Sequence, residues 1–278
     1  MTTITDRAPC LLCASSRSIP AFTHPSPLRR CPNCGLVSTT LEATPTPSYG
    51  EGYFFDGGYR SYFARATQWR YEARQRLRWL RGSARPRTLF EIGCAGGFFL
   101  EAARDAGIAA SGVEASEPAA RYAHDVLGVP VVGARFEDAD LDGPFDAVCA
   151  FHVLEHVDDP RAFLVKAREL IASGGWLALE VPNIESAAAH ADGIKWPGLQ
   201  PQYHRWHFAP PTLTRLVEET GFRVTDCDTV SARFYTRPAR RVTTDALAGL
   251  RAAVRSRSFR TVDPRSGDHV RLLAGPLP

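Results

Sequence analysis

Two pairs of cysteines near the N-terminus have the spacing of metal ligands. Cys10 and Cys13 form one C-x-x-C pair, and Cys31 and Cys34 form a second. Each pair can chelate one side of a tetrahedral ion, and the separation between the pairs is typical of four-cysteine zinc sites. Because four thiolates leave no coordination position open, we expect a structural zinc ion in a ribbon that spans residues 1–40.

A second group of residues surrounds a glycine-rich turn, Gly93–Gly97. An apolar run precedes the turn and a helical pattern comes after it, so unpaired N–H groups and glycine backbone would face a ligand. The glycines at positions 93, 96 and 97 do not have the G-x-G-x-x-G spacing of dinucleotide-binding folds, which hold a pyrophosphate. Glu91 precedes the turn, and Glu114 ends the next apolar run, where an acid that binds ribose hydroxyls belongs.

Histidines and aromatic residues gather in a later segment, residues 203–208. Histidine is the side chain whose ordinary pKa suits proton removal near neutral pH. We expect His204 to be the first candidate for a general base and His207 the second, although each has an alternative role as an anchor of the loop through hydrogen bonds. The candidate substrate contacts are Tyr53, Tyr59, Tyr203 and Trp206.

The elements that would position these residues alternate between strands and helices from Thr88 onward. This alternation is typical of a parallel sheet covered by helices. Helices are expected to begin near Gly97, Glu117, Pro160 and Pro211, where prolines fit because the first turn of a helix tolerates a missing N–H. The predicted strands are Thr88–Ile92, Ala109–Glu114, Val129–Val132, Phe145–Phe151, Gly175–Val181 and Phe222–Val230.

Four segments therefore make up the expected domain organisation. The zinc ribbon, residues 1–40, precedes a connector and an amphipathic cap helix, residues 41–85, with the helix itself over Arg60–Leu80. The α/β domain, with helices on both faces of its sheet, spans residues 86–237. Residues 238–278 form an Arg-rich tail that we expect to be partly helical, with one short helix from Asp245.

The order of the strands, the glycine turn and the acids from Thr88 to Val230 resembles that of the class I S-adenosylmethionine-dependent methyltransferases. The first motif of that family runs acid-x-G-x-G-x-G, with Ala95 at its central glycine here, and its second strand ends in an acid. The stretch "FDAVCAFHVLEHV" resembles the fourth strand and the segment after it. The resemblance implies a Rossmann-like fold, S-adenosylmethionine as cofactor, and His152 near the sulfonium as a third catalytic candidate. It assigns the cofactor to Glu91, Gly93, Cys94, Ala95, Gly97, Glu114, Ala115, Phe136, Glu137, Phe151 and His152.

The ribbon, the string "YGEGYFF" and the amphipathic helix are similar to a bacterial subset of these methyltransferases, often small-molecule enzymes of secondary metabolism. The resemblance implies methylation of a small natural-product intermediate at O, N or C, with a histidine as base. A D/N-P-P-F/Y motif, used on exocyclic amines, is absent after the fourth strand. The alternatives are a zinc-ribbon RNA methyltransferase, a non-methylating enzyme that uses S-adenosylmethionine, and a non-catalytic scaffold. The ribbon lacks the aromatic and basic stripe that nucleic-acid binding favours.

The composition is that of an ordinary globular chain. It has 278 residues, 44% of them hydrophobic, and a formal net charge of +3 that indicates no particular partner. No run of about 18 apolar residues and no signal-peptide pattern occurs, so we expect a cytoplasmic protein without a membrane partner. The 7 cysteines, an odd number, argue against a disulfide framework. The substrate, the methylated atom and the oligomeric state stay open.

Overall fold

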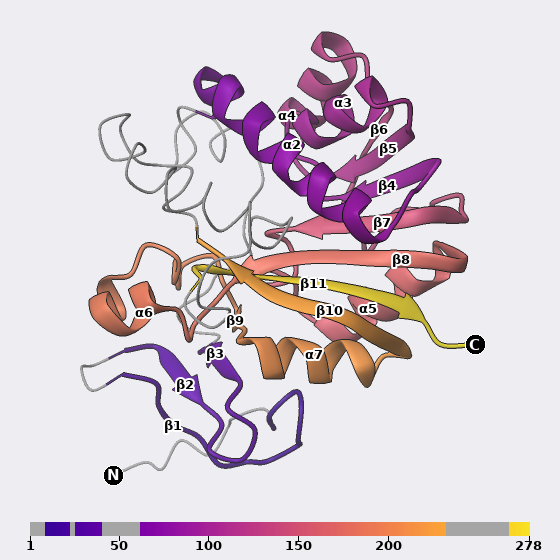
Figure 1. Ribbon diagram of the computed structural model, residues 1–278. Coiled ribbons are helices and arrows are strands. Elements are labelled where there is room, and N and C mark those ends of the chain that lie inside the picture. Colours follow the sequence, from indigo (N-terminus) through magenta and orange to yellow (C-terminus); the bar gives the residue numbers. More distant parts are fainter. Residues whose placement is uncertain (1–8, 23–25, 41–61, 232–266) are drawn as a thin grey trace, which may run out of the picture.

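A seven-stranded sheet forms the centre of the protein in the computed structural model, which describes residues 9–22, 26–40, 62–231 and 267–278 (Figure 1). The strand order is β10-β11-β8-β7-β4-β5-β6. Neighbouring strands from β8 to β6 are parallel, whereas β11 is antiparallel to both β8 and β10. The strands are β4 (Thr88–Ile92), β5 (Ala109–Glu114), β6 (Val131–Gly133), β7 (Phe145–Phe151), β8 (Ile171–Pro182), β10 (Phe222–Val230) and β11 (His269–Pro276).

Helices cover both faces of this sheet, as parallel strands joined by helical crossovers require. Figure 1 shows α2 and α3 on one side and α5 and α7 on the other. This arrangement confirms the predicted Rossmann-like α/β fold. The helices are α2 (Ala66–Ser83), α3 (Phe98–Asp105), α4 (Glu117–Arg121), α5 (Pro160–Glu169), α6 (Ala187–Asp192) and α7 (Pro210–Glu218), with short 3-10 or π turns η2 (Phe63–Arg65), η3 (Tyr122–Val126) and η4 (Gly193–Lys195).

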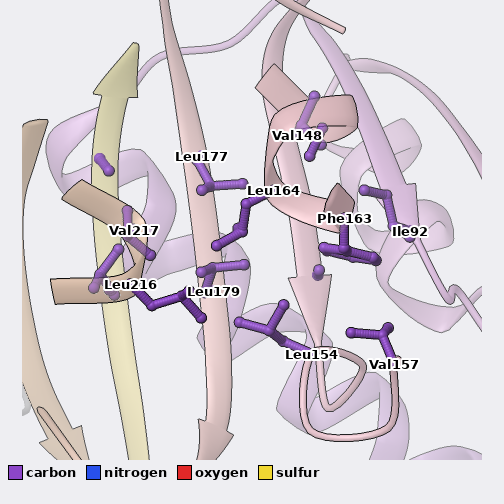
Figure 2. Close-up of a cluster of buried hydrophobic side chains, with 14 of the residues drawn as sticks. Ile92, Val148, Leu154, Val157, Phe163, Leu164, Leu177, Leu179, Leu216 and Val217 are labelled. Carbon is purple, nitrogen blue, oxygen red and sulfur yellow. The ribbon is translucent and has the colours of Figure 1, made fainter. Parts of the chain in front are cut away.

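Successive residues of the central strands pack into two different apolar clusters. On β4, Leu89 packs on the α2 and α3 side, whereas Phe90 and Ile92 pack on the α5 and α7 side. Figure 2 shows the second cluster, where Leu164 of α5 and Leu177 of β8 lie together, both fully buried. Each such side chain contributes about 1.5–3 kcal/mol to stability relative to its exposed state. The two clusters therefore hold the strand ends, and the residues just beyond them, in fixed positions.

Most predicted elements of the α/β domain have the predicted bounds. The strands β4, β5, β7 and β10 begin and end where the sequence places them, while β8 is longer than predicted and begins at Ile171. The amphipathic helix differs at both ends, because the α-helix begins at Ala66 after a 3-10 turn and continues to Ser83. Its residues Ala73, Leu77 and Leu80 are buried, which is the helical period that the sequence indicated.

The C-terminal strand β11 contradicts the prediction of a tail over all of 238–278. His269–Pro276 lies inside the sheet, hydrogen-bonded to β8 and β10. The run is short and the charged residue Arg271 interrupts it, so the local sequence pattern does not indicate a strand. Val270, Leu272, Leu273 and Ala274 are nevertheless fully buried, as expected of a strand with neighbours on both sides. The helix expected from Asp245 lies outside the described residues.

The N-terminal ribbon is joined to the α/β domain by a shared sheet. Its strands β1 (Ile19–Pro20), β2 (Leu28–Arg30) and β3 (Val37–Thr39) are completed by β9 (Trp206–His207), which comes from the histidine segment. Leu12 and Leu36 also pack into the cluster of Figure 2. The ribbon and the histidine segment are therefore one structural unit.

Candidate active site

A cavity of about 760 Å³ lies at the carboxyl ends of the parallel strands β4, β5, β7 and β8. This edge is where open α/β sheets commonly bind ligands. The glycine turn after β4 lines one part of the cavity, and the segment from Trp196 to His204 lines another. The cavity therefore brings together the two groups of residues that the sequence singled out.

The glycine turn needs backbone conformations that favour glycine. Gly93, Ala95 and Gly97 all have positive φ angles, of 69°, 46° and 79°. A Cβ atom on Gly93 would lie 2.5 Å from Cγ2 of Val153, so this position has no room for a side chain. Gly93 and Ala95 line the cavity. Gly97 is not among the lining residues, and a Cβ there would lie 2.8 Å from that of Ala123, so it allows the turn to pack closely on η3.

Two buried glutamates face the cavity beside this turn. Glu114 accepts hydrogen bonds from the backbone N–H groups of Ala95 and Ser116, both at 2.8 Å. Burial raises the pKa of Glu114, although these N–H groups lower it. Burial also raises the pKa of Glu91 to about 8, against the attraction of Arg76. Glu91 Oε2 is buried without a hydrogen-bond partner among the described residues, so a ligand with a polar or cationic group would satisfy it.

The other residues assigned to the cofactor also line the cavity. Phe136 packs edge-on against Phe163, with ring centroids 4.9 Å apart, and it presents an aromatic surface beside Glu137. Tyr62, which was not predicted from the sequence, stacks on Trp69, and its hydroxyl accepts a hydrogen bond from the Gly96 N–H at 3.4 Å. The remaining lining residues from the assigned set are Cys94, Ala115, Phe151 and His152.

A buried glutamate at the end of β8 connects three elements. Glu180 accepts hydrogen bonds from Arg76 of α2 at 2.6 Å, from Arg271 of β11 at 2.5 Å and from His152 at 3.2 Å. Although burial opposes the charged form, Arg271 and Arg76 hold the pKa of Glu180 well below its usual range. None of Glu180, Arg76 and Arg271 was predicted from the sequence. A signal was present, because Glu180 and Arg271 are single charges inside otherwise apolar strands.

His152 lies between two carboxylates at the end of β7. Its Nε2 is 3.2 Å from Glu180 Oε1 and its Nδ1 is 3.3 Å from Glu155 Oε1. Burial lowers the pKa of His152, but the two glutamates outweigh burial and raise the pKa to about 9. His152 is therefore an imidazolium at neutral pH, with no lone pair to accept a proton. His269 of β11 lies beside it, with ring centroids 4.6 Å apart.

Glu155, His156 and His204 form a cluster on another wall of the cavity. His156 Nδ1 donates to the Tyr203 carbonyl, and His204 Nδ1 donates to the Gly198 carbonyl, both at 3.1 Å. Burial lowers the pKa of both histidines, that of His204 well below its usual range, so both rings are neutral. Each Nε2 therefore carries a lone pair. Within this cluster, His204 is the residue for which the sequence predicted a catalytic role.

His207 lies away from the cavity lining and holds the segment to the ribbon. The Thr39 hydroxyl donates to the His204 carbonyl at 2.7 Å, so it accepts from His207 Nε2 at 2.8 Å. Burial lowers the pKa of His207 to about 3, so the ring stays neutral. Trp206 and Tyr203 are not lining residues either, and Trp206 Nε1 donates to the Val157 carbonyl. Tyr53 and Tyr59 lie outside the described residues.

The four N-terminal cysteines converge in the ribbon. One sulfur from each residue lies within 4.8 Å of the other three. The two C-x-x-C turns have the same hydrogen bonds. In the first turn, Cys10 N donates to Ser15 O and Ala14 N donates to Cys10 O. In the second turn, Cys31 N donates to Leu36 O and Gly35 N donates to Cys31 O. Ala14 and Gly35 both have positive φ angles. Two equivalent turns that bring four thiols together are the arrangement expected of a tetrahedral metal site.

The fold and the cavity define a known class of domain. Residues 62–226 match the family model described as "Methyltransferase domain", so the chain belongs to that family.

No helix among the described residues is long and apolar enough to span a membrane.

Curated relatives of this chain carry the name ubiquinone biosynthesis O-methyltransferase. The one from Thiobacillus denitrificans is 31% identical over 117 residues, which are 39% of this chain and 50% of the relative. The one from Dinoroseobacter shibae is 30% identical over 153 residues, which are 50% of this chain and 60% of the relative. The chain thus spans about half the length of the curated relatives it matches.

Solved structures share the fold at low sequence identity. A possible histamine N-methyltransferase from Thermotoga maritima has a TM-score of 0.57 at 20% identity, over 80% of this chain and 97% of its own. The methyltransferase CcbJ from Streptomyces caelestis has a TM-score of 0.51 at 16% identity, over 74% and 90%. The [4+2]-cyclase SpnF has a TM-score of 0.52 at 20% identity, over 74% and 82%. These likenesses show the fold alone.

Proposed function

We propose that the protein is an S-adenosylmethionine-dependent methyltransferase that methylates a hydroxyl oxygen of a small molecule. The observation that carries the proposal is the composition of the cavity. One wall holds the glycine turn with Glu91 and Glu114, and another holds neutral histidines with available lone pairs. The family membership and the O-methyltransferase names of the curated relatives support the same reaction.

The cofactor would lie along the wall made by the ends of β4 and β5. Each carboxylate oxygen of Glu114 accepts one backbone N–H, from Ala95 or from Ser116. Because a carboxylate oxygen can accept more than one hydrogen bond, Glu114 can also accept hydrogen bonds from ribose hydroxyls. Glu91, whose Oε2 has no partner among the described residues, suits the ammonium group of the methionine part. Phe136 and Glu137 suit the adenine. When bound, the cofactor supplies an electrophilic methyl group on a sulfonium.

The acceptor would lie near His204, at the other wall. Methyl transfer is an in-line displacement, so the protein must orient the hydroxyl and remove its proton. With the cofactor bound, transfer of its methyl group to the acceptor oxygen would require the hydroxyl proton to pass to a group with a free lone pair. Nε2 of His204 meets that condition, whereas the His152 imidazolium does not. His156 Nε2 meets the condition too. Of the two we assign ionisation of the acceptor to His204, the histidine that the sequence singled out as a candidate base.

The ribbon would hold a structural zinc ion through Cys10, Cys13, Cys31 and Cys34. The proposal rests on the four converging sulfurs and on the equivalent turns that present them. A small ribbon of three short strands has too little core of its own to be stable, so metal binding and packing against β9 would together supply its stability.

Cofactor binding and methyl transfer test this function separately. Glu114→Ala should weaken binding of S-adenosylhomocysteine by roughly 10-fold to 100-fold, because charge-assisted hydrogen bonds contribute about 1.5–3 kcal/mol. Calorimetric titration measures this loss, and Glu117→Ala, on the exposed first turn of α4, is the matched control. Unchanged affinity in Glu114→Ala would contradict the assigned pocket. Transfer of a labelled methyl group to hydroxylated aromatic and aliphatic acceptors then distinguishes methylation from a non-methylating use of the cofactor.

A further inference from the structure

Three side chains on the acceptor wall offer metal-ligand atoms that converge. One ligand atom each from Glu155, His156 and His204 lies within 4.8 Å of the other two, and all three residues line the cavity. We propose that this cluster binds a divalent transition-metal ion, separate from the four cysteines of the ribbon. The role of the ion in catalysis rests on the proposed function, whereas its binding does not.

The hydrogen bonds of the two histidines prepare them to bind a metal. Each Nδ1–H is donated to a backbone carbonyl, that of Tyr203 for His156 and that of Gly198 for His204. Carbonyl acceptors of this kind fix the tautomer and the ring orientation of metal-binding histidines, and leave Nε2 as the ligand atom. The two rings are edge to face with centroids 4.7 Å apart. No donor is therefore left on either ring to bind the nearby carboxylate.

The carboxylate of the cluster lacks hydrogen-bond partners. Glu155 is 1% exposed, and both of its oxygens are buried without a hydrogen bond among the described residues. The Nδ1 atom of His152 lies 3.3 Å from Glu155 Oε1, and the other ring nitrogen of His152 contacts Glu180. Burial of a carboxylate beside two histidine lone pairs is unfavourable unless another cation joins them. A metal ion would bind all three groups at once.

The ligand set indicates the class of metal. Two imidazoles and one carboxylate suit first-row divalent ions such as Zn²⁺, Fe²⁺ and Mn²⁺, and they leave coordination positions open. Ligand atoms about 2.1 Å from one tetrahedral ion are about 3.4 Å apart, so side-chain rotations that bring the three atoms closer together would close the site. Because the ligands line the cavity, the open positions face the acceptor.

A bound ion would change how His204 acts. The acceptor hydroxyl would coordinate to an open position, and the positive charge would lower its pKa. The proton would pass to solvent water, the ionised oxygen would form its bond to the methyl carbon, and the S–C bond would break. His204 would then contribute to ionisation as a metal ligand, and its lone pair would not receive the proton.

Manganese binding tests the site without any assay of activity. Mn²⁺ prefers oxygen and nitrogen ligands to thiolates, so in full-length protein loaded with one equivalent of Zn²⁺ the added Mn²⁺ reports sites other than the four cysteines. Electron paramagnetic resonance measures free Mn²⁺ during titration of the protein. We expect one Mn²⁺ per chain, and a loss of affinity of roughly 100-fold or more in Glu155→Gln and in His204→Asn. Glu72→Gln is the matched control, since Glu72 lines the same cavity outside the cluster.

Two results would overturn the metal site. One is the absence of Mn²⁺ binding by the zinc-loaded wild type, and the other is unchanged affinity in Glu155→Gln. Thermal unfolding of each variant identifies any loss that comes from misfolding, and Glu155→Gln should fold, because it removes a buried charge. If Mn²⁺ fails to bind and His204→Asn still abolishes methyl transfer, the metal proposal is wrong and His204 keeps the role of a base.

Discussion

Individual residues of the site were predictable where their chemistry interrupts a pattern. Glu91 and Glu114 stand at the ends of apolar runs, and the sequence predicted both; the structure places both on the cavity wall. His204 and His207 have the same residue type in one segment, yet only His204 lines the cavity. His207 instead forms a hydrogen bond with Thr39, which is 168 positions away in the sequence. A local sequence pattern cannot indicate a contact of that separation.

Gly93 provides a test of how tightly the turn is packed. Gly93→Ala combines a positive φ with a Cβ that would lie 2.5 Å from Val153, whereas Gly107→Ala has a positive φ of 81° and no atom within 4 Å. The backbone strain alone costs about 1–2 kcal/mol. We expect Gly93→Ala to lose about 1–3 kcal/mol more than Gly107→Ala in urea unfolding, because overpacking adds to the strain. Equal losses would show that Val153 moves away freely.

Glu180 provides a test of buried charge. Glu180→Gln leaves Arg76 and Arg271 without their shared carboxylate, and breaking such a buried pair costs about 3–5 kcal/mol. The control is Glu101→Gln, whose partner Arg70 is 36% exposed, and we expect it to cost about 0–1 kcal/mol. Chemical unfolding measures both. A small loss in Glu180→Gln would mean that water replaces the carboxylate.

The sequence predicted the strongly apolar strands together with their bounds, but it did not predict the strand β11. The strands β4, β5 and β7 read as apolar runs between turns, which is the pattern of buried parallel strands. The β11 segment, His269–Pro276, is short and comes after an Arg-rich region, so composition assigned it to a tail. Its place between β8 and β10 depends on pairing with residues far away in the sequence, which local patterns do not report.

Removal of β11 should prevent folding of the sheet. A chain that ends at residue 266 would expose the edges of β8 and β10 and would lose the buried side chains from Val270 to Ala274. We expect no cooperative thermal transition by circular dichroism. Deletion of the exposed Pro278 alone is the control and should melt like the full chain. A cooperative transition in the shorter chain would mean that β8 and β10 pair directly.

On the scale of the whole molecule, the ribbon and the α/β domain share one sheet, one apolar cluster and one hydrogen-bond network. The strand pair β3–β9, the side chains of Leu12 and Leu36, and the hydroxyl of Thr39 each cross between them. The sequence indicated a ribbon and a methyltransferase-like domain, but no local pattern in it indicated that the ribbon supports the acceptor wall.

Thr39 tests this support across the molecule. Thr39→Val removes the hydrogen bonds to the His204 carbonyl and to the His207 ring, whereas Thr39→Ser retains them. We expect Thr39→Val to lower kcat by roughly 10-fold to 100-fold through displacement of His204, with little change in cofactor affinity. Steady-state kinetics and S-adenosylhomocysteine titration separate the two effects. A Thr39→Val enzyme with the kcat of Thr39→Ser would contradict a positioning role.

The shared sheet also determines the order in which the chain can fold during synthesis. The ribbon is translated first, but the strand that completes its sheet, β9, is translated much later, and Thr39 lies 165 positions before His204. The central sheet in turn needs β11, which is translated later still. Contacts of such long sequence separation slow folding. A nascent chain on the ribosome would therefore expose unpaired strand edges until β11 emerges.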